Sequence, residues 1–264
     1  KKLTGTKTAS ERLAVCQSEE LDSVIESLPG PASFPSSGIP KRYNPEAIAR
    51  YYRFRPWKTI WRSIQVAWMF GWFLGGLKLD QWTGRTESNV PRRAMQLRKL
   101  LTNLGPTFIK IGQALSTRPD LVRRDFLEQL TLLQDQLPAF PTEQAFAIIE
   151  RELDCPLEDI FQEISPQPIA AASLGQVYKG RLYNGQDVAV KVQRPGLERK
   201  LTLDLHIIRG VTKAIGRWLP VNVSHDLSMI VDEFGTKLFE EIDYQNEGRN
   251  AEQFARNFQD SPEV

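Results

Sequence analysis

Cysteine and histidine are scarce in this chain of 264 residues, which has two of each. The cysteines, Cys16 and Cys155, lie far apart, and no cysteine or histidine spacing is typical of a zinc site or a redox pair. A disulfide-stapled fold is therefore excluded, and we expect no metal site. Neither sign of charge dominates, because 34 Lys and Arg residues stand against 32 Asp and Glu residues. Since this gives no overall basic footprint, we expect no nucleic-acid partner.

A long apolar run is also lacking. The most apolar stretch, Ile64–Leu77, has 14 residues, whereas a membrane-spanning helix needs about 20. Hydrophobic residues make up 41% of the chain and charged residues 25%, close to the values of soluble globular proteins. The first residue is not Met and nothing marks a C-terminal end, so we expect a fragment of a longer protein.

Basic residues and tryptophans gather in one part of the chain. Between Lys41 and Leu100 there are 13 Lys and Arg residues but only 3 acidic ones, a net charge of 13 − 3 = +10. Five of the six tryptophans lie there, and four of them are spaced by 4, 7 and 4 residues, which places them on one helix face. These five are Trp57, Trp61, Trp68, Trp72 and Trp82.

Two interpretations of this basic segment remain open. In the first, the aromatic face packs on the main domain and the neighbouring basic side chains are solvated. Those side chains are Arg50, Arg53, Arg55, Lys58 and Arg62. In the second, the helix lies on an anionic membrane surface, where tryptophan and basic side chains are both favourable.

Four segments are expected along the chain. Residues 1–41 are polar and rich in Ser, Gly and Pro, which predicts a disordered tail. Residues 42–90 form the basic, Trp-rich amphipathic helical segment, and residues 91–163 a second helical segment. Residues 164–264 begin with strands and return to helical periodicity.

The expected helices follow from proline positions and apolar periodicity. One helix should run from Asn44 to about Gly76. Three more should lie between residues 92 and 154, with the second opened by Pro119 and the third by Pro141. A single long helix is expected from His225 to Phe258.

A β-hairpin carries the first chemical signal. Residues 172–182 and 187–193 alternate like strands, and Asn184-Gly185 between them is a hairpin turn. The second strand contains Val-Ala-Val-Lys, with the lysine at position 191. Protein kinases have a glycine-rich turn before such a lysine, which binds nucleotide phosphates. Here Gly175 matches the third glycine, while Ala170 and Ala172 occupy the first two glycine positions. The alternative is an ordinary hairpin with a surface lysine.

The turn and two helices hold further candidate residues. Alanine restricts the backbone more than glycine does, so the turn should be stiff, although its N–H groups and Ser173 offer donors to phosphate. Lys110 and Gln113 share one face of an apolar helix. Asp243 and Glu247 share a face of the expected C-terminal helix.

These motifs together resemble the UbiB-type atypical kinase-like family, also called the AarF-domain kinases. The resemblance runs from about Pro91 to the end of the chain. The K-x-G-Q motif is found at residues 110–113, the alanine-rich loop at 170–173, the nucleotide lysine at 191 and the E-x-D motif at 241–243.

The resemblance implies an α+β fold, in which accessory helices precede a protein-kinase-like small lobe made of an antiparallel sheet and a helix. It implies that ATP or ADP is bound by the alanine-rich loop, Gly175 and Lys191. The loop residues are Ala170, Ala171, Ala172 and Ser173. Glu247 is implied as the partner of Lys191. Lys110 and Gln113 would dock the accessory helices against Glu241 and Asp243, through a buried ion pair.

The catalytic loop of a kinase, with its Asp and Asn, and the Asp-Phe-Gly metal site do not occur before Val264. We therefore expect the C-terminal large lobe to be missing from this chain. Without it we expect no catalytic residue here, and Mg²⁺ to bind only when that lobe is present.

For the whole protein, the resemblance implies an atypical kinase or ATPase, of the phosphotransferase class. It would support prenyl-quinone or lipid metabolism at a membrane and contact a lipidic substrate. The alternative is a nucleotide-binding pseudokinase scaffold for quinone-biosynthesis enzymes. A plastid location is expected, with a cyanobacterial membrane or a mitochondrion as alternatives.

Overall fold

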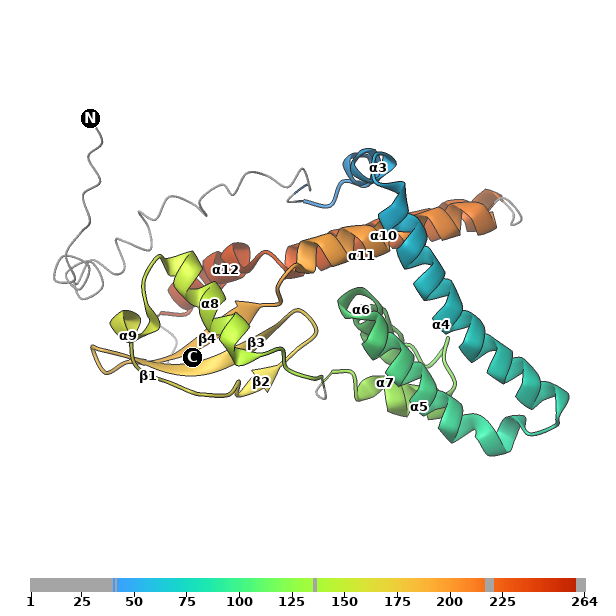
Figure 1. Cartoon of the computed structure of the whole chain (residues 1–264), viewed down its shortest axis with the longest axis horizontal. Coiled ribbons are helices and arrows are strands. Elements are labelled where there is room, and N and C mark those ends of the chain that lie inside the picture. The colour runs from blue at the N-terminus through green and yellow to red at the C-terminus, as the bar shows by residue number, and fades with distance from the viewer. Residues whose placement is uncertain (1–39, 41, 135–136, 217–220, 260–264) are drawn as a thin grey trace. The chain divides into compact units, whose positions relative to one another are not determined.

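The computed structural model describes residues 40, 42–134, 137–216 and 221–259, without the side chains of 221–226. The expected disordered tail therefore lies, apart from Pro40, outside the described residues, as do Cys16, Trp218 and the side chain of His225. The described chain forms two compact units, labelled by element in Figure 1. Residues 130–195 form the sheet unit, and residues 40–129 with 196–259 form the helical unit. The four-segment division expected from the sequence stays a prediction.

The sheet unit is built on a four-stranded antiparallel sheet. Its strands are β1 (Phe161–Ile164), β2 (Ala170–Ala171), β3 (Gly175–Leu182) and β4 (Asp187–Gln193). Strand β4 pairs with β3 along its length, from Gly175↔Gln193 to Arg181↔Asp187. Strands β1 and β2 pair with opposite ends of β3, and therefore share its other edge.

The turn of the β3–β4 hairpin confirms the sequence prediction. Gly185 has a φ of +86°, which a glycine adopts without strain. The side-chain oxygen of Asn184 accepts a hydrogen bond from the N–H of Gln186 at 2.9 Å. The first strand begins at Gly175 and not at residue 172, because Ala172 already belongs to the turn that joins β2 to β3.

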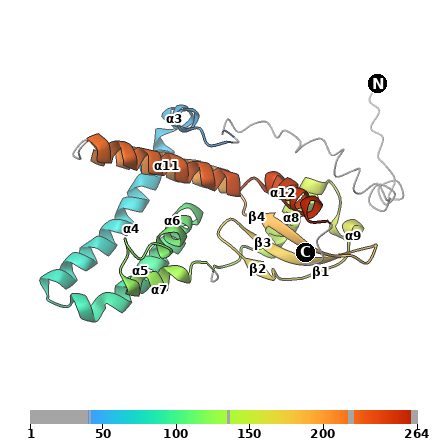
Figure 2. The ribbon, with the colours of Figure 1, turned by 180° about the vertical axis from the view of Figure 1, so that it is seen from behind.

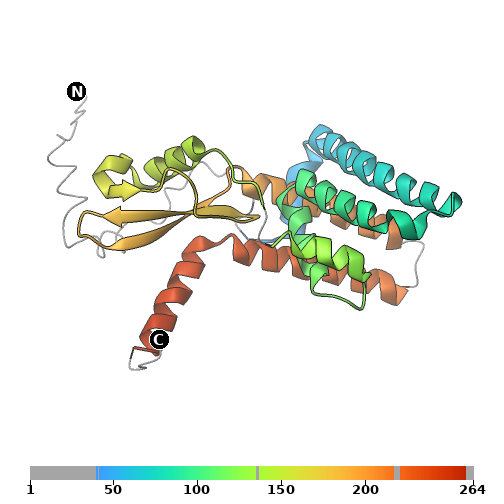
Figure 3. The same cartoon turned by 90° about the horizontal axis from the view of Figure 1, so that it is seen from below.

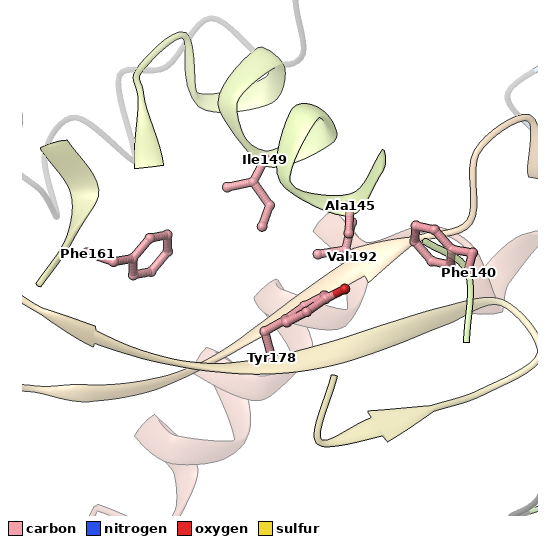
Figure 4. Packing of buried hydrophobic residues seen from close by; sticks show 6 residues of the cluster. All are labelled: Phe140, Ala145, Ile149, Phe161, Tyr178 and Val192. Atoms are coloured by element: carbon pink, nitrogen blue, oxygen red, sulfur yellow. The ribbon is translucent and has the colours of Figure 1, made fainter. Parts of the chain in front are cut away.

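One face of the sheet is covered by α8 (Thr142–Leu153), which follows Pro141 as expected. Figure 4 shows Ala145 and Ile149 of α8 pointing toward Tyr178 and Val192 on the strands. Tyr178 and Ala145 are fully buried. A short helix, α9 (Leu157–Ile160), leads from α8 into β1. The core of the sheet unit therefore lies between α8 and the sheet.

The helical unit is built around α10 (Leu197–Gly216), which packs against α3, α4, α6 and α11. Its inward side chains include Leu201 and Leu205, at most 1% exposed. The other helices are α3 (Pro45–Arg53), α4 (Pro56–Trp82), α5 (Thr86–Leu104), α6 (Pro106–Ser116), α11 (Val221–Glu241) and α12 (Tyr244–Asn257). Helices α4 and α5 lie side by side (Figure 2). Helix α7 (Arg124–Thr131) leads into the sheet unit.

Several expected helices are interrupted. The first breaks before Pro56, because a proline disfavours helical geometry in the residue before it. The second breaks at Gly105, whose φ is +101°. The long C-terminal helix breaks at Asp243, which caps α12, and α12 turns away from the direction of α11 (Figure 3). The expectation for Pro119 was wrong, since the helix that follows it begins only at Arg124.

Candidate functional site

Two candidate residues, Ala170 and Lys191, lie in one row across the sheet, with Val177 between them. Ala170 on β2 pairs with Val177 on β3, and Val177 pairs with Lys191 on β4. Directly opposite residues point to the same face of a sheet, and neighbours along a strand point to opposite faces. Since Tyr178 points into the core beneath α8, the row of Val177 faces away from that core. Ala170 and Lys191 are both exposed, with about 9.5 Å between their strands.

The alanine-rich loop is a tight turn between β2 and β3. The N–H of Ala172 donates to the carbonyl of Gly175 at 2.8 Å, and the N–H of Ile169 donates to the carbonyl of Val177 at 2.8 Å. Among the described residues, Asp154 is the only non-glycine with a positive φ, so the alanines sit in unstrained backbone. Ser173 is buried at 2% exposed. The turn is thus closed by its own backbone hydrogen bonds.

Arg194 fastens this turn to the end of β4. Its Nε and Nη2 donate to the carbonyl oxygen of Ala172 at 3.1 and 3.0 Å. Nη2 also donates to the carbonyl oxygen of Pro138 at 2.6 Å. The backbone N–H of Arg194 donates to the carbonyl of Leu174 at 2.9 Å. The guanidinium lies 5.6 Å from the centroid of the Phe140 ring.

The two halves of the expected lysine–glutamate pair belong to different units. Lys191 is on β4 of the sheet unit, and Glu247 is on α12 of the helical unit. Their pairing therefore stays a prediction. Of the described residues, no three His, Cys, Asp or Glu side chains gather as a metal site would require.

In the helical unit, Lys110 of α6 and Glu241 at the end of α11 form an ion pair through Nζ and Oε1. The side chain of Lys110 is 19% exposed and that of Glu241 48% exposed. The expectation of a buried pair was therefore wrong, because the end of α11 leaves the carboxylate half in solvent. Gln113 lies one turn along α6 from Lys110 and is partly buried.

Asp243 has a separate role at the break between α11 and α12. Its carboxylate accepts a hydrogen bond from the N–H of Asn246 at 3.0 Å, so it is the N-cap of α12. N-cap aspartates satisfy an N–H that the helix itself leaves unpaired. The E-x-D motif thus divides its acids between an ion pair and a helix cap.

The family model of the ABC1 atypical kinase-like domain matches residues 132–264, half of the chain. The chain belongs to the ABC1 atypical kinase-like family. This confirms the resemblance to the UbiB-type family, and with it the α+β kinase-like fold that combines helices with a small antiparallel sheet.

Two curated relatives of this ABC1-family chain come from a cyanobacterium and a plant. Uncharacterized protein slr1919 of Synechocystis sp. is 60% identical over 224 residues, covering 85% of this chain and 40% of that protein. Protein ACTIVITY OF BC1 COMPLEX KINASE 3, chloroplastic, of Arabidopsis thaliana is 49% identical over 223 residues, covering 84% of this chain and 31% of that protein. The chain thus spans between about a third and two fifths of their lengths.

A solved structure also matches, the complex of Rv3197 with erythromycin from Mycobacterium tuberculosis. It is 28% identical and covers 69% of this chain and 46% of that chain, with a TM-score of 0.37.

Sequence reasoning missed two residues that hold together the segments around the candidate site. One is Arg194, whose only signal was its place three residues after Lys191. The other is Gln176, which is 1% exposed. Its Oε1 accepts from the N–H of Phe140 at 3.0 Å, and its Nε2 donates to the carbonyl of Phe140 at 3.2 Å and to the hydroxyl of Tyr178 at 2.6 Å. Gln176 thereby ties β3 to the segment before α8.

The basic segment agrees only in part with the packing interpretation, since Arg50, Arg53 and Lys58 are exposed as it expects, whereas the tryptophans and Arg62 differ from it. The tryptophans of α4 are exposed, from 61% for Trp57 to 88% for Trp82. Arg62 is not solvated, because it pairs with the buried Asp204 of α10. Burial raises the pKa of the Asp204 carboxyl, and Arg62 opposes that shift. No helix in the described part of the chain is both long and apolar enough to cross a membrane.

Proposed function

We propose that this chain supplies the nucleotide phosphate site of an atypical kinase or ATPase, and that ATP or ADP binds on the sheet face that carries Lys191. The observation that carries the proposal is the row in which Ala170, Val177 and Lys191 lie side by side on the exposed face. The family matched by residues 132–264 is kinase-like, which agrees with a nucleotide ligand.

The chemistry follows from the side chains of this row. The ammonium group of Lys191 is a compact positive charge that attracts phosphate oxygens. Ala170 and Val177 are small, so they leave room above the sheet next to that charge. The alanine turn connects β2 to β3 next to this row. A nucleotide held by Lys191 would therefore have its phosphates near the turn.

The proposed setting is a plastid or a cyanobacterial membrane. Relatives include chloroplastic proteins of Arabidopsis thaliana and a protein of Synechocystis sp.. A role in prenyl-quinone or lipid metabolism at that membrane follows from the family resemblance, and it is proposed here for the whole protein.

Acylation of lysines in the full-length protein tests the nucleotide site without a substitution. An amine-reactive acylating reagent, followed by peptide mass spectrometry, measures the reactivity of Lys191 with and without ATP. Lys179, exposed on the same sheet face and two residues from Val177, is the internal reference. ATP should protect Lys191 and leave Lys179 unchanged, whereas equal labelling of Lys191 in both samples would contradict the proposal. If ATP protects Lys191 but is not turned over, the scaffold alternative replaces the enzyme.

A further inference from the structure

Helix α4 has an unusually apolar exposed face. Seven residues spaced by three, four or seven positions form one stripe along it. They are Trp57, Trp61, Ile64, Trp68, Trp72, Leu79 and Trp82, each between 54% and 88% exposed. At 1.5 Å per residue, the stripe is about 37 Å long. We call it the tryptophan face. Monomeric soluble proteins rarely expose contiguous apolar patches of this kind unless they bind something.

The opposite face of α4 is anchored within the helical unit. Arg62 pairs with Asp204 of α10 at 2.8 Å. Near the other end of α4, Asp80 is 5% exposed and accepts from Nε of Arg93 on α5 at 2.5 Å. Phe73, between these two ion pairs, is buried. Because α4 is fixed at both ends, it cannot rotate to bury its tryptophans, and the tryptophan face stays directed outward.

Charge indicates what this face binds. The only acidic residue of α4 is Asp80, which is buried and paired with Arg93. Lys58 and Lys78 are exposed on the helix, and Arg85 is exposed just beyond its end. The exposed surface of the helix is therefore positive and aromatic. Tryptophan is favoured at the boundary between lipid head groups and acyl chains, because its ring is apolar and its N–H still finds a polar partner.

We propose that the tryptophan face of α4 docks on an anionic lipid bilayer, with the helix lying in the plane of the head groups. Basic residues near an anionic leaflet add electrostatic attraction that falls as salt rises. This proposal deepens the membrane part of the function proposed above and rests on that part alone. Nucleotide binding is measured separately, so failure of one leaves the other standing.

Vesicle cosedimentation of the full-length protein tests this docking. Vesicles of phosphatidylcholine with phosphatidylglycerol should bind the protein, and vesicles of phosphatidylcholine alone should bind it much less. The Trp61→Ala/Trp68→Ala/Trp72→Ala variant should lower the partition coefficient by about tenfold or more. The matched control replaces three exposed apolar residues of the helical unit outside α4. These are Met95, Val211 and Phe254, each changed to Ala.

A charge variant completes the experiment. Lys58→Glu/Lys78→Glu should weaken binding to the anionic vesicles by about tenfold or more. Each basic residue near an anionic leaflet contributes about 1 kcal/mol to binding, which corresponds to about a fivefold change in affinity. Lys99→Glu, an exposed position on α5, should change it little. An unaltered far-UV circular dichroism spectrum and unfolding temperature show that the variants are folded. Equal binding to both vesicle types, or a tryptophan-dependent dimer without vesicle binding, would overturn the proposal.

Independently, the hydrogen bonds of Arg194 carry a second inference. Its guanidinium and N–H together occupy the carbonyl oxygens of Pro138, Ala172 and Leu174. Carbonyl oxygens carry partial negative charge and repel phosphate. We infer that Arg194 is a positioning residue, which keeps the alanine turn closed and the carbonyl oxygen of Ala172 bound to its guanidinium. This inference rests on the proposed nucleotide site.

Two readouts test the role of Arg194. Arg194→Met should speed amide hydrogen exchange in the peptide that covers residues 169–176, and should weaken ATP binding by about tenfold. Arg194→Lys should rescue little, because a lysine lacks the planar fork that bonds two carbonyls. Arg181→Met, an exposed arginine of β3, is the matched control. Unchanged amide exchange in Arg194→Met would show that Arg194 does not keep the alanine turn closed. Faster exchange in that variant, with no ATP binding by the wild type, would instead refute the nucleotide site.

Discussion

Nε of Arg62 on α4 lies 2.8 Å from Oδ1 of Asp204 on α10, and Nη2 lies 3.1 Å from Oδ2. The same Nη2 donates to the carbonyl of Leu104 at the end of α5 at 2.5 Å. One guanidinium therefore joins three helices of the helical unit. The Asp204 side chain is 1% exposed and that of Arg62 17% exposed, so this ion pair is almost excluded from water.

Removing Arg62 should leave the Asp204 carboxylate buried without this partner. Arg62→Met should lower the free energy of unfolding by about 3–5 kcal/mol, because a buried charge loses its partner. Adding Asp204→Asn to that variant should recover part of the loss. Arg53→Met, at an exposed arginine of α3, should change stability by less than about 0.5 kcal/mol. Denaturant unfolding measures all of these, and a loss below about 1 kcal/mol in Arg62→Met would show that the pair is not an anchor.

The cap of α12 gives a second prediction. Asp243→Ala should cost about 1 kcal/mol and speed amide exchange in the first turn of α12, because the N–H of Asn246 loses its acceptor. Asp243→Asn, which keeps an acceptor oxygen, should behave like the wild type. Equal losses in the two variants would assign the effect to charge and not to capping.

The ion pair of Lys110 and Glu241 should contribute modestly. Because the Glu241 side chain is 48% exposed, a double-mutant cycle of Lys110→Met and Glu241→Gln should give a coupling of about 0.2–1 kcal/mol. The coupling should shrink at high salt. A cycle of Lys110→Met with Asp243→Asn should give less, since Asp243 caps α12. Coupling above about 3 kcal/mol would mean that the pair is buried in solution.

His206 should make the helical unit sensitive to mild acid. It stacks on Tyr52 of α3, with ring centroids 5.3 Å apart. Burial, with a smaller effect of Lys213, lowers its pKa from the usual 6.5. Below pH 6.5 the unfolded state therefore binds more protons than the folded state, and stability falls until the pH passes the lowered pKa. His206→Gln should remove this slope between pH 7.5 and 5 in thermal unfolding, and an identical slope in both proteins would refute it.

Local signals predicted the hairpin well. The Asn184-Gly185 pair lies between two strands of alternating polarity and specifies a tight hairpin turn. This turn fixes the register that aligns Val177 with Lys191. The helix breaks were harder to find, because apolar periodicity continues across Gly105 and Asp243. A break there depends on a single backbone conformation or a single cap, which a periodic pattern does not reveal.

Contacts between residues far apart in the chain could not be predicted from the sequence. Arg194 reaches Ala172 and Pro138, which are 22 and 56 positions away. The tryptophan spacing correctly indicated one helix face, but spacing does not say whether a face is covered. That answer came from Arg62 and Asp80, whose partners fix the opposite side of α4.

Thermal stabilisation of the full-length protein by ATP tests whether Lys191 binds nucleotide phosphates, as proposed above. Lys191→Met keeps the length of the side chain and removes its charge, and Lys179→Met does the same at another exposed lysine of the same sheet face. We expect ATP to raise the unfolding temperature of the wild type and of Lys179→Met, and to leave Lys191→Met unchanged. Full stabilisation of Lys191→Met by ATP would show that the Lys191 ammonium group does not bind the phosphates.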